Sequence, residues 1–208
     1  MTTERLRQHL LEEVVIFESA VDGASGAESV SPRQAHRPQP PTGRSALTPE
    51  TVSLQHRVEQ FLFHQAELLD SGCWREYIDL FADEGIYWMP VKPDQTEWLD
   101  SPSIFIEDKS MMQIRMDRVM HPNAWSRAAA WGTSHVVGNV VVESQSAERI
   151  SVRSRFHMLE LRRDTLRHFA GTYRHTLVHA GDELRIGLQR VDLLNSQAVF
   201  DYVLQVWV

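Results

Sequence analysis

The sequence predicts an α+β fold, in which helices come first and mostly antiparallel strands come last. Two observations lead to this prediction. Apolar residues recur largely at helical spacing between Thr48 and Met120, and from Thr133 onward they alternate with polar residues, which is the period of a strand. Such an order is typical of a long, curved sheet with helices packed on one face. The 208 residues are 42% hydrophobic and 24% charged, so one ordinary core is expected.

The N-terminal part of the chain is expected to stand apart from this core. Residues 1–21 are predicted to form an amphipathic helix, because Leu6, Leu10, Val14 and Phe17 step along one face. Residues 22–47 have no periodicity and are rich in proline, glycine and serine, which predicts a linker. The main domain is therefore expected to span residues 48–208.

The main domain is predicted to begin with a helical pair that leads into a strand. Thr48 is suited to cap the first helix, because Pro49 lacks the N–H that the first helical position does not need. A second helix, with Trp74, Tyr77, Ile78 and Phe81 on one face, is expected to end at the acidic turn 83–85. The aromatic run 86–89 then predicts a short strand closed by Pro90.

One more helix and four or five strands complete the prediction. The helix is expected to end near Met120, with Met111, Ile114 and Met120 on its buried face. Alternating patterns predict strands over residues 136–142, 150–158, 169–177 and 184–194, with a hairpin turn at residues 180–182. The last ten residues, 199–208, are expected to form one more extended segment.

Composition excludes several classes of partner. The net charge of −7 and the lack of an extended basic run argue against nucleic-acid binding. No window approaches the roughly 18 to 20 apolar residues that span a bilayer, and the N-terminus lacks the pattern of a signal peptide. The single cysteine, Cys73, excludes an internal disulfide. A cytoplasmic protein with no membrane partner is expected.

The sequence lacks the common catalytic motifs for nucleotides and nucleophilic serine, and one cysteine cannot supply the thiolates of an iron–sulfur or structural zinc site. His175 and His179 lie four apart in a strand pattern, roughly 13 Å apart at about 3.3 Å per residue, and are expected on the sheet surface rather than on one metal ion. His135 and His157, with Tyr87, form the one candidate acid–base set, provided that they face a common cavity.

The aromatic side chains between residues 74 and 88 have two interpretations. Trp74, Tyr77, Tyr87 and Trp88, with Phe81, are expected to pack between helix and sheet, although they would also suit the wall of a ligand pocket.

Several segments together resemble one protein family. They are FLFHQAELLDSGCWREYIDLFADEGIYWMPV, HPNAW, SHVVGNVVVE, ISVRSRFHMLELRR and FAGTYRHTLVHAGDELRIGLQRVDLL, which lie in this order between residues 61 and 194. This set resembles the small, or beta, subunit of aromatic-ring-hydroxylating dioxygenases. The resemblance implies a cone-shaped fold similar to nuclear transport factor 2, and an assembly of three beta with three large, alpha subunits.

The resemblance also implies where the chemistry lies. The alpha subunit would carry the Rieske [2Fe–2S] cluster and the mononuclear Fe(II), and NADH would supply electrons through a reductase. The beta chain would carry no catalytic, cofactor or metal residue and would hold the hexamer together, partly through beta–beta contacts. The candidates for interface or core positions are the aromatics Trp74, Tyr77, Tyr87, Trp88, Phe200, Tyr202 and Trp207.

Two other functions stay open from the sequence. The chain would also suit a free-standing dehydratase or isomerase of the same cone fold, with His157, His135 and Tyr87 as candidate catalytic residues. It would also suit a small-ligand binding protein whose pocket the aromatic cluster lines.

Overall fold

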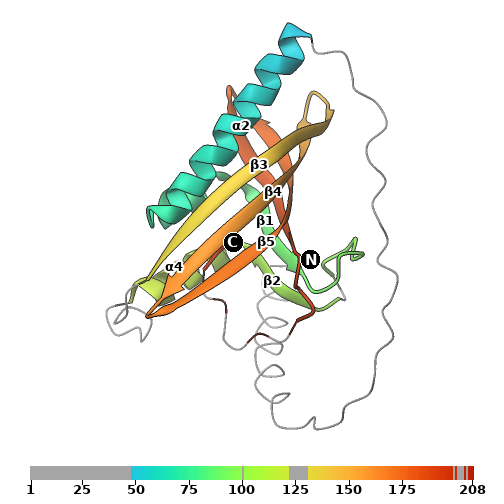
Figure 1. Cartoon of the computed structure of the whole chain (residues 1–208). Coiled ribbons are helices and arrows are strands. Elements are labelled where there is room, and N and C mark those ends of the chain that lie inside the picture. The colour runs from blue at the N-terminus through green and yellow to red at the C-terminus, as the bar shows by residue number, and fades with distance from the viewer. Residues whose placement is uncertain (1–47, 100, 122–130, 199, 201–203, 205) are drawn as a thin grey trace. The chain divides into compact units, whose positions relative to one another are not determined.

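The computed structural model describes residues 48–99, 101–121, 131–198, 200, 204 and 206–208. The helix expected at residues 1–21 and the linker expected at 22–47 lie outside the described residues. The described elements, in chain order, are α2 (Pro49–Asp70), α3 (Trp74–Asp79), β1 (Phe81–Pro90), β2 (Ser103–Asp108), α4 (Lys109–Met120), β3 (Trp131–Gln145), β4 (Arg149–Arg162), β5 (Thr165–Ala180) and β6 (Glu183–Leu193) (Figure 1).

Helix α2 begins and ends where the sequence predicts. The Thr48 side chain accepts a hydrogen bond from the backbone N–H of Thr51 at 3.2 Å, and Pro49 occupies the first turn. The helix ends at Asp70, and Gly72 follows with a φ of 69°, the left-handed conformation that glycine adopts without strain. Its buried face includes Val58, Leu62, Leu68 and Leu69, which pack toward the sheet.

The six strands form one sheet in the order β2-β1-β6-β5-β4-β3. Strands β3, β4, β5 and β6 pair antiparallel as successive neighbours, as the alternating pattern predicts. The hairpin between β5 and β6 contains Gly181 at a φ of 64°. Strand β1 pairs parallel with β6 and antiparallel with β2, so the sheet is mixed rather than wholly antiparallel.

The boundary between α3 and β1 differs from the prediction. Residues 83–85 do not end a helix, because α3 already ends at Asp79 and β1 begins at Phe81. The pairing of β1 with β6 is irregular between Phe81 and Ile86, and the exposed Asp83 and Glu84 fall within this irregularity. The acidic residues that suggested a turn therefore mark a distorted part of a longer strand.

The region before Met120 also differs in two respects. Residues 103–108, for which no strand was predicted, form β2 by pairing with β1. The buried face of α4 is formed by Met112 and Met116, whereas Ile114 and Met120 are exposed by 42% and 49%. The helix begins at Lys109, and the side chain of Asp108 caps it by accepting a hydrogen bond from the backbone N–H of Met111 at 2.8 Å. Packing of α4 against β1 and β2 then determines which face of the helix is buried.

One hydrophobic core lies on the face of the sheet that carries α2 and α3, and Figure 1 shows α2 running alongside β3, the strand on which it packs. We call this face of the sheet the interior. The side chains of Leu204, Val206, Trp207 and Val208 belong to the same core. The segment expected to be extended at residues 199–208 lies partly outside the described residues, and residues 204 and 206–208 are not part of a strand.

Candidate functional site in the interior of the sheet

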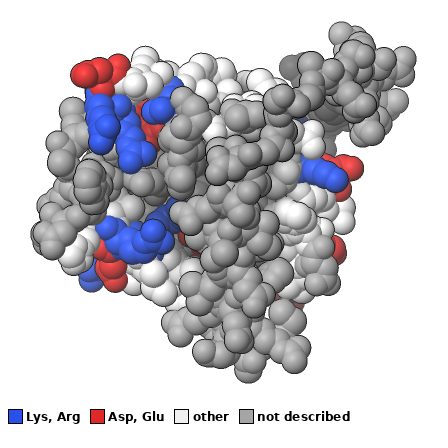
Figure 2. All heavy atoms as spheres, turned by 90° about the horizontal axis from the view of Figure 1, so that it is seen from below, with Lys and Arg blue, Asp and Glu red and all other residues white. Residues whose placement is uncertain are grey.

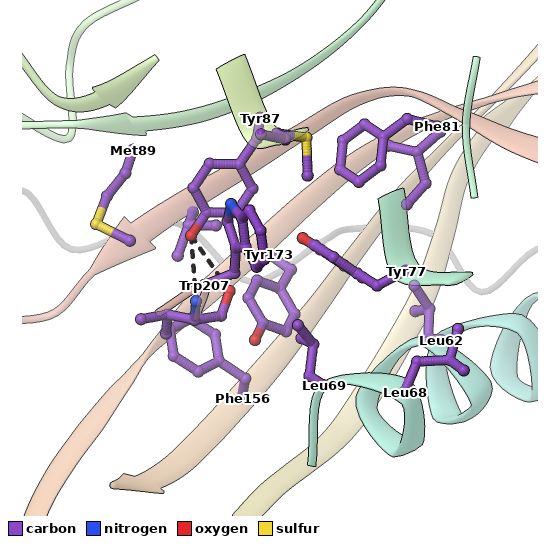
Figure 3. Close-up of a cluster of buried hydrophobic side chains, with 14 of the residues drawn as sticks. Leu62, Leu68, Leu69, Tyr77, Phe81, Tyr87, Met89, Phe156, Tyr173 and Trp207 are labelled. Atoms are coloured by element: carbon purple, nitrogen blue, oxygen red, sulfur yellow. Dashed lines mark hydrogen bonds between the residues drawn. The ribbon is translucent and has the colours of Figure 1, made fainter. Parts of the chain in front are cut away.

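Three tyrosines from three elements meet in the interior. Tyr77 comes from α3, Tyr87 from β1 and Tyr173 from β5, and each is at most 2% exposed (Figure 3). The Tyr173 ring stacks on Phe156 of β4 with ring centroids 4.1 Å apart, and the Tyr77 hydroxyl donates to Oε1 of Gln189 at 3.0 Å. Burial raises the pKa of all three phenols, so they stay neutral at physiological pH.

The described end of the chain enters this interior. The Tyr87 hydroxyl lies 3.2 Å from the backbone nitrogen of Val208 and 3.4 Å from its carbonyl oxygen, and Figure 3 shows both contacts as dashed lines. The indole Nε1–H of Trp207 donates to Oε2 of Glu107 at 3.0 Å. Trp207 is 3% exposed, so its ring fills space that would otherwise lie open between α3 and the sheet.

Glu107 is a buried carboxylate with a compensated charge. It is 5% exposed, and its Oε1 accepts from Nε of Arg115 at 2.6 Å and lies 2.5 Å from a terminal guanidinium nitrogen of the same side chain. The guanidinium lies over the ring of Phe105 at 3.9 Å. The ion pair fixes the carboxylate, and its second oxygen remains directed at Trp207.

Several polar groups of the interior have no hydrogen-bond partner among the described residues. They are Oε1 of Gln65, Nε2 of His135, Oγ of Ser154, both carboxylate oxygens of Glu160, both ring nitrogens of His175 and Nε2 of Gln189. His175 and Gln189 are direct partners in the pairing of β5 with β6. Burial lowers the pKa of His175 to about 3, so the imidazole is neutral at pH 7.

The prediction that His175 and His179 share the sheet surface is wrong for His175. Its side chain is 2% exposed because it continues the inward row of Tyr173 and Leu177 on β5, whereas His179 is exposed at the end of the strand. A neutral imidazole can occupy a buried position on a strand. The alternation of residues shows which side chains share a face of the strand, but it does not show which of the two faces is buried.

One recess of the interior lies beside Gln65 and Tyr173. This recess between α2 and the sheet is lined by Leu62, Gln65, Ala66, Leu69, Val137 and Tyr173. It has no room for a molecule of the size of water. The side chains of the tyrosines, of Trp207 and of the α2 leucines fill the space instead, as Figure 3 shows.

His135 on β3 fastens the end of α2 to the sheet. Its Nδ1 lies 2.5 Å from Oδ1 of Asp70, and its backbone N–H donates to Oδ2 of the same carboxylate at 2.7 Å. The Thr133 hydroxyl donates to Oδ1 at 3.0 Å. Burial raises the pKa of Asp70, but these hydrogen bonds and the attraction of His135 outweigh it, so that the pKa of Asp70 lies below its usual value.

His157 lies on the opposite face of the sheet. It is exposed, and its Nδ1 lies 2.9 Å from Nε2 of His168 on β5. His135 and His157 are set apart because His135 pairs with Met158, the neighbour of His157, and adjacent residues of a strand point to opposite faces. The structure therefore does not bring the candidate set of His135, His157 and Tyr87 together in one cavity.

The remaining candidate aromatics occupy different places. Trp74 and Trp88 are 7% and 1% exposed, and Trp88 donates from Nε1 to the hydroxyl of Ser103 at 3.0 Å. Phe200 is partly buried against the core, and Tyr202 lies outside the described residues.

Several ion pairs lie on the outer face of the sheet, the face opposite the interior. Arg153 donates to Glu143 at 2.7 Å, Arg174 lies 3.4 Å from Asp192, and Arg190 lies 2.7 Å from Asp192. In Figure 2, where the described residues are visible, basic side chains likewise lie beside acidic ones. This distribution suits a mixed, solvated surface rather than the continuous basic area that nucleic acid requires.

The described residues contain no group of three or more histidine, cysteine, aspartate or glutamate side chains placed to hold a metal ion. Cys73 is free and partly buried at the start of α3. Among the same residues, no helix has the length and apolarity needed to span a membrane.

The ion pair between Glu107 and Arg115 is not predicted from the sequence. Glu107 is the last residue but one of β2, and Arg115 reaches it from α4. The available signal was the N-cap Asp108, which separates a strand from a helix at that point.

Comparison with known proteins gives a consistent result. The family model described as "Ring hydroxylating beta subunit" matches residues 64–198. The beta subunit of benzoate 1,2-dioxygenase from Acinetobacter baylyi is 25% identical over 162 residues, which cover 76% of this chain and 92% of the relative.

Solved structures show the same fold. The beta subunit of benzoate 1,2-dioxygenase from Burkholderia mallei superposes with a TM-score of 0.58 and 23% identity, covering 77% of this chain and all of that one. A chain of naphthalene 1,2-dioxygenase gives a TM-score of 0.65 at 16% identity, covering 76% of this chain and 86% of that one.

Proposed function

This chain belongs to the family of ring-hydroxylating beta subunits, and from this premise we propose that it is the non-catalytic assembly subunit of an aromatic-ring-hydroxylating dioxygenase. The complete enzyme adds both atoms of O2 to an aromatic ring and yields a cis-dihydrodiol. The reaction belongs to the complex, and this chain supports the large subunit that performs it.

The partner in this proposal is a large, alpha subunit. It holds a Rieske [2Fe–2S] cluster and a mononuclear Fe(II), and a reductase delivers the electrons of NADH. The residues of this chain do not fit the cluster, because Cys73 is its only cysteine and a Rieske centre needs two thiolates. We propose three copies of each subunit in a hexamer with beta–beta contacts, and a cytoplasmic location.

The observation that carries the proposal is the filled interior. A free-standing enzyme of this fold would need a cavity that exposes an acid–base pair to substrate. Here the recess beside Tyr173 has no room for water, and Trp207 occupies the space beside Tyr77. His135 is bound to Asp70, and His157 faces away from both tyrosines. The geometry supports a scaffold more than a catalyst.

The experiment is reconstitution of the complex. The full chain is expressed alone, the large subunit is expressed alone, and the two are expressed together. With reductase, NADH and a benzoate-type or hydrocarbon aromatic, only the co-expressed pair is expected to oxidise the substrate efficiently, and iron is expected to be found with the large subunit.

Two variants separate the proposal from a catalytic role of this chain. His157→Ala and His135→Gln are introduced into the co-expressed complex, and turnover per assembled large subunit is measured. We expect kcat to be retained within about twofold once assembly is corrected for. Turnover by the isolated chain that His157→Ala abolishes without unfolding would overturn the proposal.

A further inference from the structure

Trp207 is held in the interior as a ligand is held in a binding site. Its ring centroid lies 5.4 Å from that of Tyr77 and 6.3 Å from that of Trp74, and the Trp74 ring meets it edge-on with planes 79° apart. Both neighbours come from α3, about 130 residues earlier in the chain. Edge-on and tilted contacts of this kind are the favoured arrangements of aromatic rings.

The polar end of the indole also has a prepared partner. Nε1–H points to Oε2 of Glu107 at 3.0 Å, while Arg115 binds the other oxygen. A buried carboxylate oxygen that is fixed in this way is a strong acceptor, and it is costly to leave without a donor. The arrangement therefore distinguishes an aromatic ring that has an N–H from one that lacks it.

The walls of this site and its occupant are separate parts of the chain. Trp74, Tyr77 and Glu107 belong to α3 and β2, which are ordered by α2, β1 and α4. The occupant follows the last strand of the sheet, and Tyr87 fastens its backbone at Val208.

We propose that the interior of this chain is a binding site for a planar aromatic group with one N–H donor, and that Trp207 is the ligand which the chain supplies to itself. The free ligand class is that of indoles substituted at carbon 3, the position that Cβ of Trp207 occupies. The inference goes beyond the proposed assembly function and does not depend on it, because it concerns recognition within a single chain.

The seated Trp207 keeps this site closed to other molecules. In the native chain a free indole has to displace a group that is covalently tethered and therefore present at high effective concentration. Native protein is thus expected to show no saturable binding of a free indole at concentrations that fill the site of a Trp207→Ala variant.

The test uses the full-length Trp207→Ala variant and 3-methylindole, which is the free-molecule analogue of the whole tryptophan side chain. The midpoint of thermal unfolding and the heat of binding are measured over a concentration series. We expect saturable binding with one site per chain and a midpoint that rises with ligand concentration, because a ligand of the native state stabilises it. If the variant is unfolded alone, 3-methylindole is expected to restore its native circular dichroism.

Two controls test the specificity of the site. First, 3-methylbenzothiophene has nearly the same shape but carries sulfur in place of the N–H, and it is expected to bind at least about tenfold more weakly, because Glu107 then lacks its donor. Second, Trp88→Ala removes a different buried indole, one that donates to the neutral hydroxyl of Ser103 rather than to a carboxylate. Its unfolding midpoint is expected to change little with 3-methylindole.

Three results would each overturn the proposed indole site. The proposal is overturned if Trp207→Ala neither binds 3-methylindole nor regains its fold at saturating concentrations. It is also overturned if both heterocycles bind equally, which would indicate an unspecific apolar cavity, or if Trp88→Ala responds as strongly as Trp207→Ala. In the double variant Trp207→Ala/Glu107→Gln, the preference for the N–H compound is expected to fall.

Discussion

The hydroxyl of Tyr87 lies 3.2 Å from the backbone nitrogen of Val208 and 3.4 Å from its carbonyl oxygen. A phenol on β1, the first strand of the domain, therefore satisfies both backbone groups of a residue 121 positions later. Both residues are 0% exposed, so no solvent replaces these contacts if the hydroxyl is removed. Buried backbone groups without partners are costly, and this contact is therefore a determinant of stability.

Tyr87→Phe is expected to destabilise the chain by about 1–2 kcal/mol, because it removes the hydroxyl but keeps the ring. The free energy of unfolding is measured by urea denaturation monitored by circular dichroism. Tyr173→Phe is the matched control, because it removes a hydroxyl from an equally buried tyrosine whose ring stays packed on Phe156. Equal losses in the two variants would contradict the role assigned to Val208.

The pH dependence of stability is expected to contain a contribution from His175. Burial lowers its pKa to about 3 in the folded chain, below the usual value of about 6.5 in the unfolded chain. Between these values the unfolded state binds the proton more readily, so the folded state loses stability as the pH falls from about 6.5 toward 3, by at most about 1.4 kcal/mol per unit.

His175→Gln removes this titration and keeps a polar side chain of similar reach. The difference in unfolding free energy between wild type and variant is measured from pH 7.5 to 4.5, and it is expected to shift in favour of the variant as the pH falls. His179→Gln, at an exposed position of the same strand, is the control substitution. Parallel curves for wild type and His175→Gln would show that His175 does not carry the effect.

Asp70→Ala is expected to cost about 1–3 kcal/mol, because it leaves the backbone N–H and Nδ1 of His135 without their acceptor. The pKa of Asp70 is lowered in the folded state, so its stabilising contribution is present above the unfolded pKa of about 3.9 and is lost as the pH falls through the folded value. Differential scanning calorimetry at pH 7 and pH 3 is expected to show a smaller cost at pH 3. Asp94→Ala, at an exposed loop position, is the control with little effect at either pH.

Much of the sheet and little of the interior site follow from the sequence. The alternation in β4, β5 and β6 reports directly which side chains share a face, so these strands and their hairpin are predictable. Strand β2 was missed because residues 103–108 become a strand through pairing with β1, and the parallel contact of β1 with β6 joins segments about 100 residues apart. Local patterns contain no information about such pairings.

The interior site is not predictable for the same reason, since its contacts join residues far apart in the sequence. The contact between Trp207 and Glu107 joins positions 100 residues apart, and neither residue has a local signal that names the other. The sequence places aromatic residues near the start of the domain, but their common contact with Trp207 depends on the curvature of the finished sheet.

Gly171→Ala is expected to destabilise the chain by about 1–3 kcal/mol. A Cβ at this position would overlap the carbonyl oxygen of Asp192 and lie 2.9 Å from Cε1 of Phe156, so β5 would have to move away from its neighbours. Gly138→Ala is the matched control, because a Cβ there meets no atom within 4 Å. Thermal unfolding of the two variants compares them, and a larger loss for Gly138→Ala would contradict this account of the packing.

The central claim, that this chain assembles a dioxygenase without performing its chemistry, is tested most directly by native mass spectrometry with metal analysis of the co-expressed complex. The account predicts a particle with three copies of this chain and three of a large subunit, with all iron retained by the large subunit when the two are separated. Iron bound stoichiometrically to this chain, or a large subunit that assembles and turns over equally well without it, would contradict the claim.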